Sequence, residues 1–185
     1  MATAREHYSP FTLTLHWVTA ALVVAQPLLV WLSEDLPREQ HWAAVGLHKS
    51  LGVTVLVLTL VRLLARLAGH RSIPLPDQMP DWQKFVARLN HGLFYALLIG
   101  MPITGWAGAT AGGRDVSVFG AFNLPAFPMV PADRALAHNL MELHEVAGFV
   151  LIGLIALHVA GALKHYVLDR DDVLQRMLPF LPRRA

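Results

Sequence analysis

The sequence contains no cysteine, and it has few charged residues. Without thiols the chain forms no disulfide, holds no iron–sulfur cluster through thiolates and attaches no haem covalently through C-x-x-C-H. Charged residues make up 15% of the chain, compared with about 25% in an average soluble domain. The formal net charge of +2 is small and scattered along the sequence. It gives no indication of a nucleic-acid partner.

Long apolar runs take the place of the missing charge, and 55% of the residues are hydrophobic. Four segments reach or exceed the roughly 20 residues that a helix needs to cross a bilayer. They cover residues 11–32, 45–67, 89–110 and 136–168. An apolar soluble bundle is the alternative, but four such lengths in one small chain favour a membrane. We therefore expect an all-α membrane protein, a four-transmembrane-helix bundle formed by a single domain over residues 1–185.

The distribution of lysine and arginine predicts how the bundle is oriented. Eleven of the 15 basic residues fall in the N-terminal tail, the link between the second and third spans with its flanks, and the C-terminal tail. The other four are Arg38, Lys49, Arg114 and Arg134. The positive-inside rule then places both termini in the cytoplasm. The proline-broken link at 111–135 is expected on the outer face.

Ten histidines are spread along this apolar chain. Four of them fall in tails, loops or the outer mouth and are read as solvated: His7, His41, His70 and His138. Five lie at or within the expected spans, and one follows the last span: His16, His48, His91, His144, His158 and His165. Ionisable residues inside a span are functional candidates by default. Histidine is also the commonest metal ligand and an axial ligand of haem iron.

Spacing and topology sort these histidines into pairs. His144 and His158 are 14 residues apart, nearly four helical turns, so they share a face about 21 Å apart along the axis. One metal ion does not bridge that distance. Antiparallel threading puts His16 at the inner depth with His158, and His48 at the outer depth with His144. The sequence therefore predicts two bis-histidine sites stacked across the bundle, where cofactors are commonly held.

Small residues accompany these four histidines at helical spacing: Ala20, Gly52, Gly148 and Gly161. Residues three or four apart share a helix face, so each histidine is expected to have empty space beside it for a porphyrin. The alternative is that small residues simply let membrane helices pack closely.

His91 and His165 are weaker candidates. His91 begins the third span and is read either as a hydrogen-bond donor to a haem propionate or a quinone, or as an ordinary interfacial histidine. His165 lies two turns beyond His158 and is a candidate proton donor to a quinone. A snorkelling side chain beside Lys164 is the commoner explanation for that position.

Six short strings, in order, resemble the bacterial cytochrome b561 family: LHW at 15–17, GLH at 46–48, VRLLARL at 61–67, MPITGW at 101–106, LHE at 143–145 and ALH at 156–158. The resemblance runs from about Phe11 to Arg170. Members of that family are four-helix, di-haem membrane proteins. The resemblance implies two haem b groups whose axial ligands are His16, His48, His144 and His158.

Close bacterial relatives in that family include a superoxide oxidase, which oxidises periplasmic superoxide to oxygen and reduces ubiquinone. Under this resemblance the haem carries the chemistry, and no side chain acts as an acid or base. Lys49, Arg114 and Arg134 would steer the anion towards the outer haem, or are ordinary interfacial cations. The acidic side chains of Glu34, Asp35 and Glu39 on the neighbouring outer loop oppose a uniformly positive mouth.

Two other functions stay open at this point. One is that of a quinol-linked cytochrome b subunit, which exchanges electrons with a periplasmic or dehydrogenase partner. The other is that of a non-redox membrane protein whose histidines relay protons. The bilayer is the expected surrounding in every case.

Overall fold

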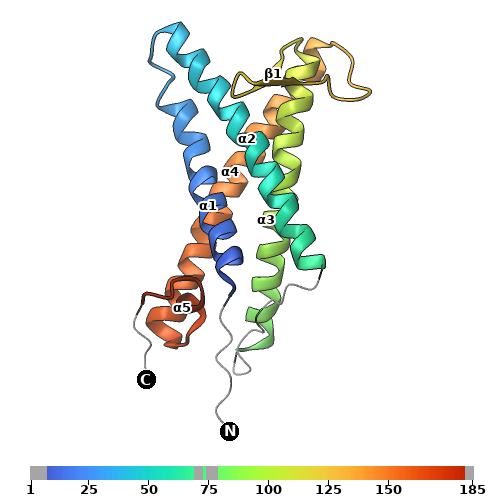
Figure 1. The fold of residues 1–185 in the computed structure, drawn as a ribbon. Helices are drawn as coiled ribbons and strands as arrows, with labels where there is room; N and C mark the ends of the chain where they lie inside the picture. The colour runs from blue at the N-terminus through green and yellow to red at the C-terminus, as the bar shows by residue number, and fades with distance from the viewer. Residues whose placement is uncertain (1–7, 69–72, 74–78, 182–185) are drawn as a thin grey trace.

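Four long helices dominate the computed structural model, which describes residues 8–68, 73 and 79–181 (Figure 1). They are α1 (Pro10–Trp31), α2 (Arg38–Leu67), α3 (Asp81–Ala111) and α4 (Arg134–Lys164). Two strands, β1 (Val116–Val118) and β2 (Phe122–Leu124), join α3 to α4. A π-helix, η1 (His165–Asp169), and the short α5 (Val173–Met177) follow α4. All four long helices have the length and hydropathy of membrane spans. The predicted four-helix membrane architecture is confirmed.

Local sequence explains where these helices start and how far they continue. Ser9 caps α1 by accepting a hydrogen bond from the Thr12 amide, and Asp133 caps α4 by accepting one from the Leu136 amide. Pro27 and Pro102 lie inside α1 and α3, and both helices continue through them. Neighbouring helices in a membrane bundle make such prolines tolerable.

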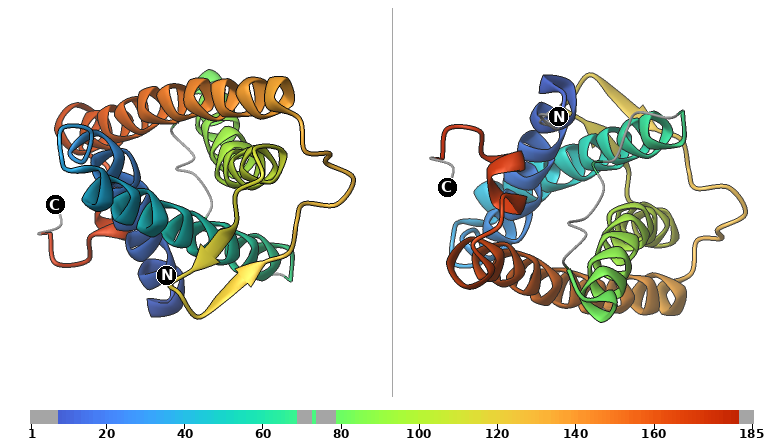
Figure 2. Two further views of the ribbon diagram at one scale, coloured as in Figure 1. Left: turned by 90° about the horizontal axis from the view of Figure 1, so that it is seen from above. Right: turned by 90° about the horizontal axis from the view of Figure 1, so that it is seen from below.

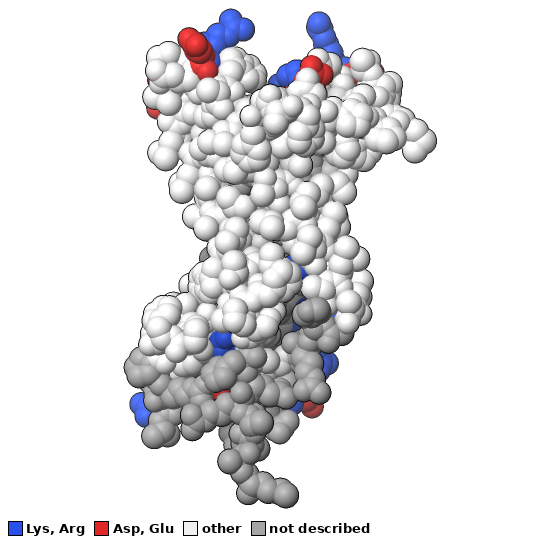
Figure 3. All heavy atoms as spheres, viewed as in Figure 1, with Lys and Arg blue, Asp and Glu red and all other residues white. Residues whose placement is uncertain are grey.

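The arrangement of the helices is that of a membrane bundle. Helix α1 packs mainly on α2, α3 packs mainly on α4, and α2 and α3 join the two pairs (Figure 2). The start of α1 and α5 lie at one end of the molecule, and the two strands lie at the other (Figure 1). On the face drawn in Figure 3, charged side chains lie towards the two ends, and the surface between them is almost entirely uncharged. This surface suits a multi-pass membrane protein.

The link between α3 and α4 contains an antiparallel hairpin that the sequence analysis did not predict. Val116 pairs with Leu124, and Val118 pairs with Phe122. Phe119 and Gly120 both have positive φ, 50° and 71°, and the Ala121 amide donates to the Val118 carbonyl at 3.0 Å. A tight turn of this handedness matches the twist of the two strands. We refer to residues 116–124 as the hairpin.

A small apolar core lies at mid-depth, with one residue from each long helix: Val23, Val55, Leu98 and Leu151. Each of these residues is seven positions from a histidine in its own helix. Seven residues of α-helix rise about 10 Å, so the core forms a layer between two levels of histidine.

Candidate functional site

One histidine pair lies on the side of the core layer that faces the start of α1. His16 on α1 and His158 on α4 place their ring centroids 6.4 Å apart with planes inclined by 55°. Both side chains are partly buried. We call them the termini-side pair.

A second pair lies on the opposite side of the core layer, below the hairpin. His48 on α2 and His144 on α4 place their ring centroids 6.0 Å apart with planes inclined by 74°. Both side chains are again partly buried. We call them the hairpin-side pair.

The ring separations suit a metal ion held between two imidazoles. A metal–nitrogen bond of about 2 Å puts the centres of two opposed imidazole rings about 6 Å apart. Helix α4 makes few backbone contacts with α1 or α2, so the facing rings meet across the space between the helix pairs. These observations fit axial ligation of a haem iron at each pair.

Hydrogen bonds orient both rings of the hairpin-side pair. His48 Nδ1 lies 3.2 Å from the Gln26 carbonyl oxygen, and His144 Nδ1 lies 2.9 Å from the Met101 carbonyl oxygen. Both acceptors directly precede an in-helix proline. An Nδ1–H that donates to a carbonyl leaves Nε2 free as the ligand and fixes the ring orientation.

The termini-side pair has a different surrounding. His16 Nδ1 is buried and has no hydrogen-bond partner among the residues described. The ring of His91 stands edge-on to His158 at 5.6 Å, and its Nδ1 lies 2.7 Å from the Ala87 carbonyl oxygen of its own helix. Arg62 of α2 is close enough to interact electrostatically with this histidine cluster. His91 is therefore a neighbour of the pair.

The glycines beside the histidines are only partly the open space expected from the sequence. Gly161 has nothing within 4 Å of an added Cβ, but Gly52 faces the Gln26 side chain and Gly148 faces the Met101 sulfur. The glycine in closest contact with a histidine ring is Gly105 on α3, where an added Cβ would lie 3.1 Å from two atoms of the His144 ring. A Cβ at this position would displace the ring by a few tenths of an ångström.

Two consecutive residues of α2, Lys49 and Ser50, form hydrogen bonds with the hairpin and the residue before it. Lys49 Nζ donates to the Asp115 carbonyl at 3.0 Å. The Ser50 hydroxyl, in a residue only 2% exposed, lies 3.1 Å from the Ser117 carbonyl oxygen and accepts from the Phe119 amide at 2.9 Å. The hairpin is thus held directly beside His48.

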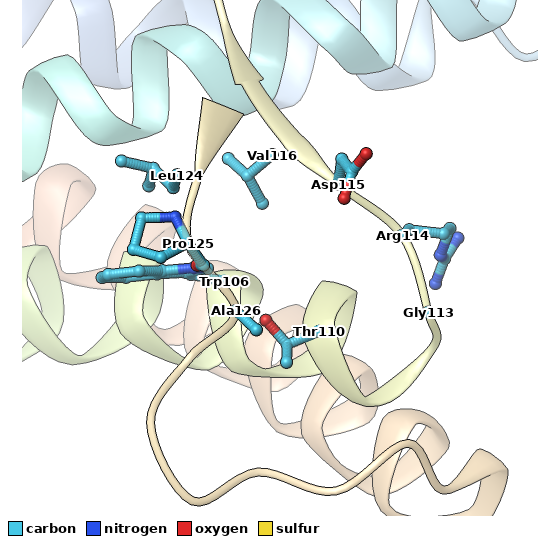
Figure 4. A pocket seen from close by; sticks show the side chains of 9 residues that line it. All are labelled: Trp106, Thr110, Gly113, Arg114, Asp115, Val116, Leu124, Pro125 and Ala126. Carbon is cyan, nitrogen blue, oxygen red and sulfur yellow. The ribbon is translucent and has the colours of Figure 1, made fainter. Parts of the chain in front are cut away.

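A cavity of about 210 Å³ opens between the end of α3 and the hairpin (Figure 4). Arg114 and Asp115 line it together with apolar side chains that include Trp106 and Leu124. Lys49 and Arg114 are near enough to interact electrostatically, and Asp115 partly offsets them. These three side chains carry two positive charges and one negative charge.

The remaining histidines and cations lie away from the two pairs. Arg134 begins α4 and is exposed, as is His138. His165 lies in a charged cluster, with Nδ1 2.7 Å from Asp171 and 3.0 Å from Asp169.

Two histidines expected to be solvated lie outside the described residues, namely His7 and His70. His41 is not simply solvated, because its Nδ1 lies 3.1 Å from the Ser33 hydroxyl oxygen.

Sequence reasoning missed Gln26, Ser50 and Gly105, which contact the hairpin-side pair or hold the hairpin over it. One available signal was the pair of in-span prolines, since Gln26 precedes Pro27 and Met101 precedes Pro102. A buried glutamine within an apolar helix was another.

Comparison with known proteins adds an independent finding. The family model for prokaryotic cytochrome b561 matches residues 7–180. "Cytochrome b561 homolog 2" of Escherichia coli K12 is 34% identical over 94% of this chain and 92% of its own length. "Cytochrome b561 homolog 1" of the same organism is 30% identical over 93% and 97%. A "Probable superoxide oxidase CybB" of Yersinia pestis is 30% identical over 93% and 96%. The chain belongs to the prokaryotic cytochrome b561 family, haem b proteins that transfer electrons in membranes.

Proposed function

We propose that this chain is a superoxide:ubiquinone oxidoreductase that holds one haem b at each histidine pair. The observation that supports this most strongly is the stack of two facing pairs, with ring separations of 6.4 and 6.0 Å, on either side of an apolar layer. His16 and His158 would ligate one iron, and His48 and His144 the other. Bound haem would supply one-electron redox chemistry.

The residues of the chain would position the two haem groups and exclude water from the space between them. The histidines fix the two sites at opposite depths, and the core layer of Val23, Val55, Leu98 and Leu151 keeps water out of the space between them. Ser50 and Lys49 attach the hairpin and the residue before it to α2, next to His48 in the sequence. Electron movement needs no acid or base from the protein at superoxide itself.

The proposed orientation places both termini in the cytoplasm and the hairpin on the periplasmic face of the bacterial inner membrane, with residues 1–185 forming one domain. The bias of basic residues towards the termini supports it. Lys49 and Arg114 then lie at the periplasmic mouth, where their charge would attract an anion. Arg134, at the start of α4, would add to this field from a greater distance along the chain.

The proposed reaction balances simply. Each superoxide gives up one electron and leaves as oxygen, whereas ubiquinone takes two electrons and two protons. Two superoxide anions are therefore consumed for each quinol formed. His91, beside His158 and exposed, is the better placed contact for the quinone. Because its Nδ1–H donates to the Ala87 carbonyl, it would donate to the quinone through Nε2 only as an imidazolium. His165 already interacts with two carboxylates and is the weaker candidate.

The names of the two Escherichia coli relatives state no substrate, so they are equally compatible with a second function. In that case the chain is a quinol-linked cytochrome b subunit that exchanges electrons with a periplasmic or dehydrogenase partner. The likeness to a probable superoxide oxidase over nearly the whole chain favours the first function.

A stopped-flow experiment on the purified, haem-loaded protein tests the proposal. Superoxide should reduce the haem promptly, and with ubiquinone present the superoxide consumed should be twice the quinol formed. If superoxide leaves the haem oxidised while a co-purified dehydrogenase reduces it, the second function is correct.

A further inference from the structure

Gln26 is a buried primary amide inside an apolar helix, only 7% exposed, and the proposed function gives it no role. A buried amide in an apolar environment is unfavourable unless it is hydrogen-bonded. Its partners should therefore show why the position holds glutamine.

The side chain of Gln26 bridges two backbone groups of α2. With the amide oriented to complete its hydrogen bonds, its nitrogen lies 3.1 Å from the His48 carbonyl oxygen. Its oxygen accepts from the Gly52 amide at 2.7 Å. In an α-helix these two groups, four residues apart, bond to each other, and α2 is continuous here, so the Gln26 amide adds a second partner to each of them. Gln26 thus spans the turn of α2 that begins at His48.

The same residue also contacts the imidazole. The Gln26 main-chain oxygen lies 3.2 Å from His48 Nδ1 and accepts its proton in the tautomer that leaves Nε2 free for a metal. The side-chain amide nitrogen also lies 2.8 Å from this Nδ1, but in that tautomer it donates to the His48 carbonyl, because a protonated Nδ1 accepts no hydrogen bond. Gly52 lies directly against this side chain, since an added Cβ there would be in van der Waals contact with the amide group of Gln26, at 3.4 Å. Three contacts from one residue of α1 therefore converge on His48 and its turn.

We propose that Gln26 is a positioning residue for His48. It fixes the imidazole through its main chain and the backbone turn beneath the imidazole through its side chain. Outer partners of this kind set the orientation and basicity of a metal-ligating histidine. The consequence for haem rests on the proposed function, whereas the bridge to α2 does not.

The test compares Gln26→Met with the unchanged protein. Methionine keeps the length and suits the membrane, but it makes neither hydrogen bond to α2. Hydrogen exchange at the Gly52 amide should rise about fivefold, the equivalent of about 1 kcal/mol for one hydrogen bond. In the haem-loaded protein, the electron paramagnetic resonance signal and midpoint potential of one haem should shift, and those of the other should not.

Two further variants make the test specific. Gln26→Glu, protonated in this apolar setting, offers an acceptor to the Gly52 amide and a donor to the His48 carbonyl, so it should restore slow exchange and a near-normal signal. Thr59→Val is the matched control: Thr59 is a buried polar residue of α2 whose hydroxyl has no partner within the described part of the chain. It should change none of these measurements.

The outcomes separate the two proposals. Unchanged Gly52 exchange in Gln26→Met, or equal haem shifts in Thr59→Val, would overturn the role of Gln26. A protein that carries no haem but shows the exchange difference keeps the bridge and rejects the proposed function. If Gln26→Met does not accumulate, Gln26→Asn retains polarity but is too short to bridge, and the same exchange increase is expected.

Discussion

At the scale of single residues, each histidine pair has a close neighbour on α3, in addition to the two facing imidazoles. On the termini side a third imidazole, His91, lies closer to His158 than His16 does, with ring centroids 5.6 Å apart compared with 6.4 Å. On the hairpin side the His144 ring packs against Gly105. Both features give direct tests of which side chains bind haem and which support them.

The first prediction distinguishes His16 from His91 as the partner of His158. His91 is exposed and stands edge-on to His158 with planes inclined by 83°, whereas His16 is partly buried and its plane is inclined to that of His158 by 55°. We expect His16→Ala to lose one of two haems per chain and His91→Ala to keep both, measured by haem content per polypeptide. The opposite pattern would exchange their roles.

The second prediction concerns Gly105. A methyl group there would be forced against the His144 ring at 3.1 Å, so Gly105→Ala should destabilise the protein by about 1–3 kcal/mol and disturb the hairpin-side haem spectrum. Gly100→Ala, in the same helix with nothing within 4 Å of an added Cβ, is the matched control. Thermal unfolding and a reduced-minus-oxidised spectrum check both. Equal behaviour of the two variants would contradict the proposed contact.

At the scale of elements, the hairpin is the part that the sequence analysis did not predict. Its strands have three residues each, and proline-broken apolar sequence gives no clear alternation over so short a length. The hydrogen bond that holds the hairpin joins residues that are distant in sequence, since Ser50 and Ser117 are separated by 67 positions. Helix α2 therefore carries both the ligand candidate His48 and the residue that holds the hairpin, Ser50.

The third prediction tests this attachment. Ser50→Ala removes the contacts to Ser117 and Phe119, which should cost about 1–2 kcal/mol locally and raise hydrogen exchange across residues 116–124. Thr54→Val is the control, because the Thr54 hydroxyl bonds only within α2, at 3.0 Å from the Ser50 carbonyl. Exchange in the hairpin that is the same for both variants would show that Ser50 does not hold it.

At the scale of the whole molecule, the bundle has two ends of different character joined by an uncharged middle (Figure 3). One end carries the hairpin, and the other carries the start of α1 and α5. Their assignment to the periplasm and the cytoplasm decides which substrate meets which histidine pair.

The fourth prediction tests that assignment and uses the absence of cysteine from the chain. Ala121→Cys lies in the hairpin turn, and Asp81→Cys lies at the start of α3, where the aspartate side chain is fully exposed. In intact spheroplasts a membrane-impermeant thiol reagent should label Ala121→Cys and not Asp81→Cys. Permeabilised cells, in which both should react, provide the control. The reverse labelling would invert the proposed topology.

The sequence by itself determined the four spans and the depth of each histidine. Both are local properties: span length follows from the apolar run, and depth follows from position within it. Because consecutive spans run antiparallel, His16 and His158 share one depth and His48 and His144 the other. The structure places the rings of these pairs next to each other, and their role as haem ligands stays a prediction.

Only the tertiary structure decided which residues support those rings. The carbonyl groups near the Nδ1 atoms of His48 and His144 come from residues 22 and 43 positions away. Such contacts depend on how each helix is rotated about its axis and on how α3 approaches α4. Neither quantity is encoded in hydropathy or spacing along one span, because close packing between helices sets both.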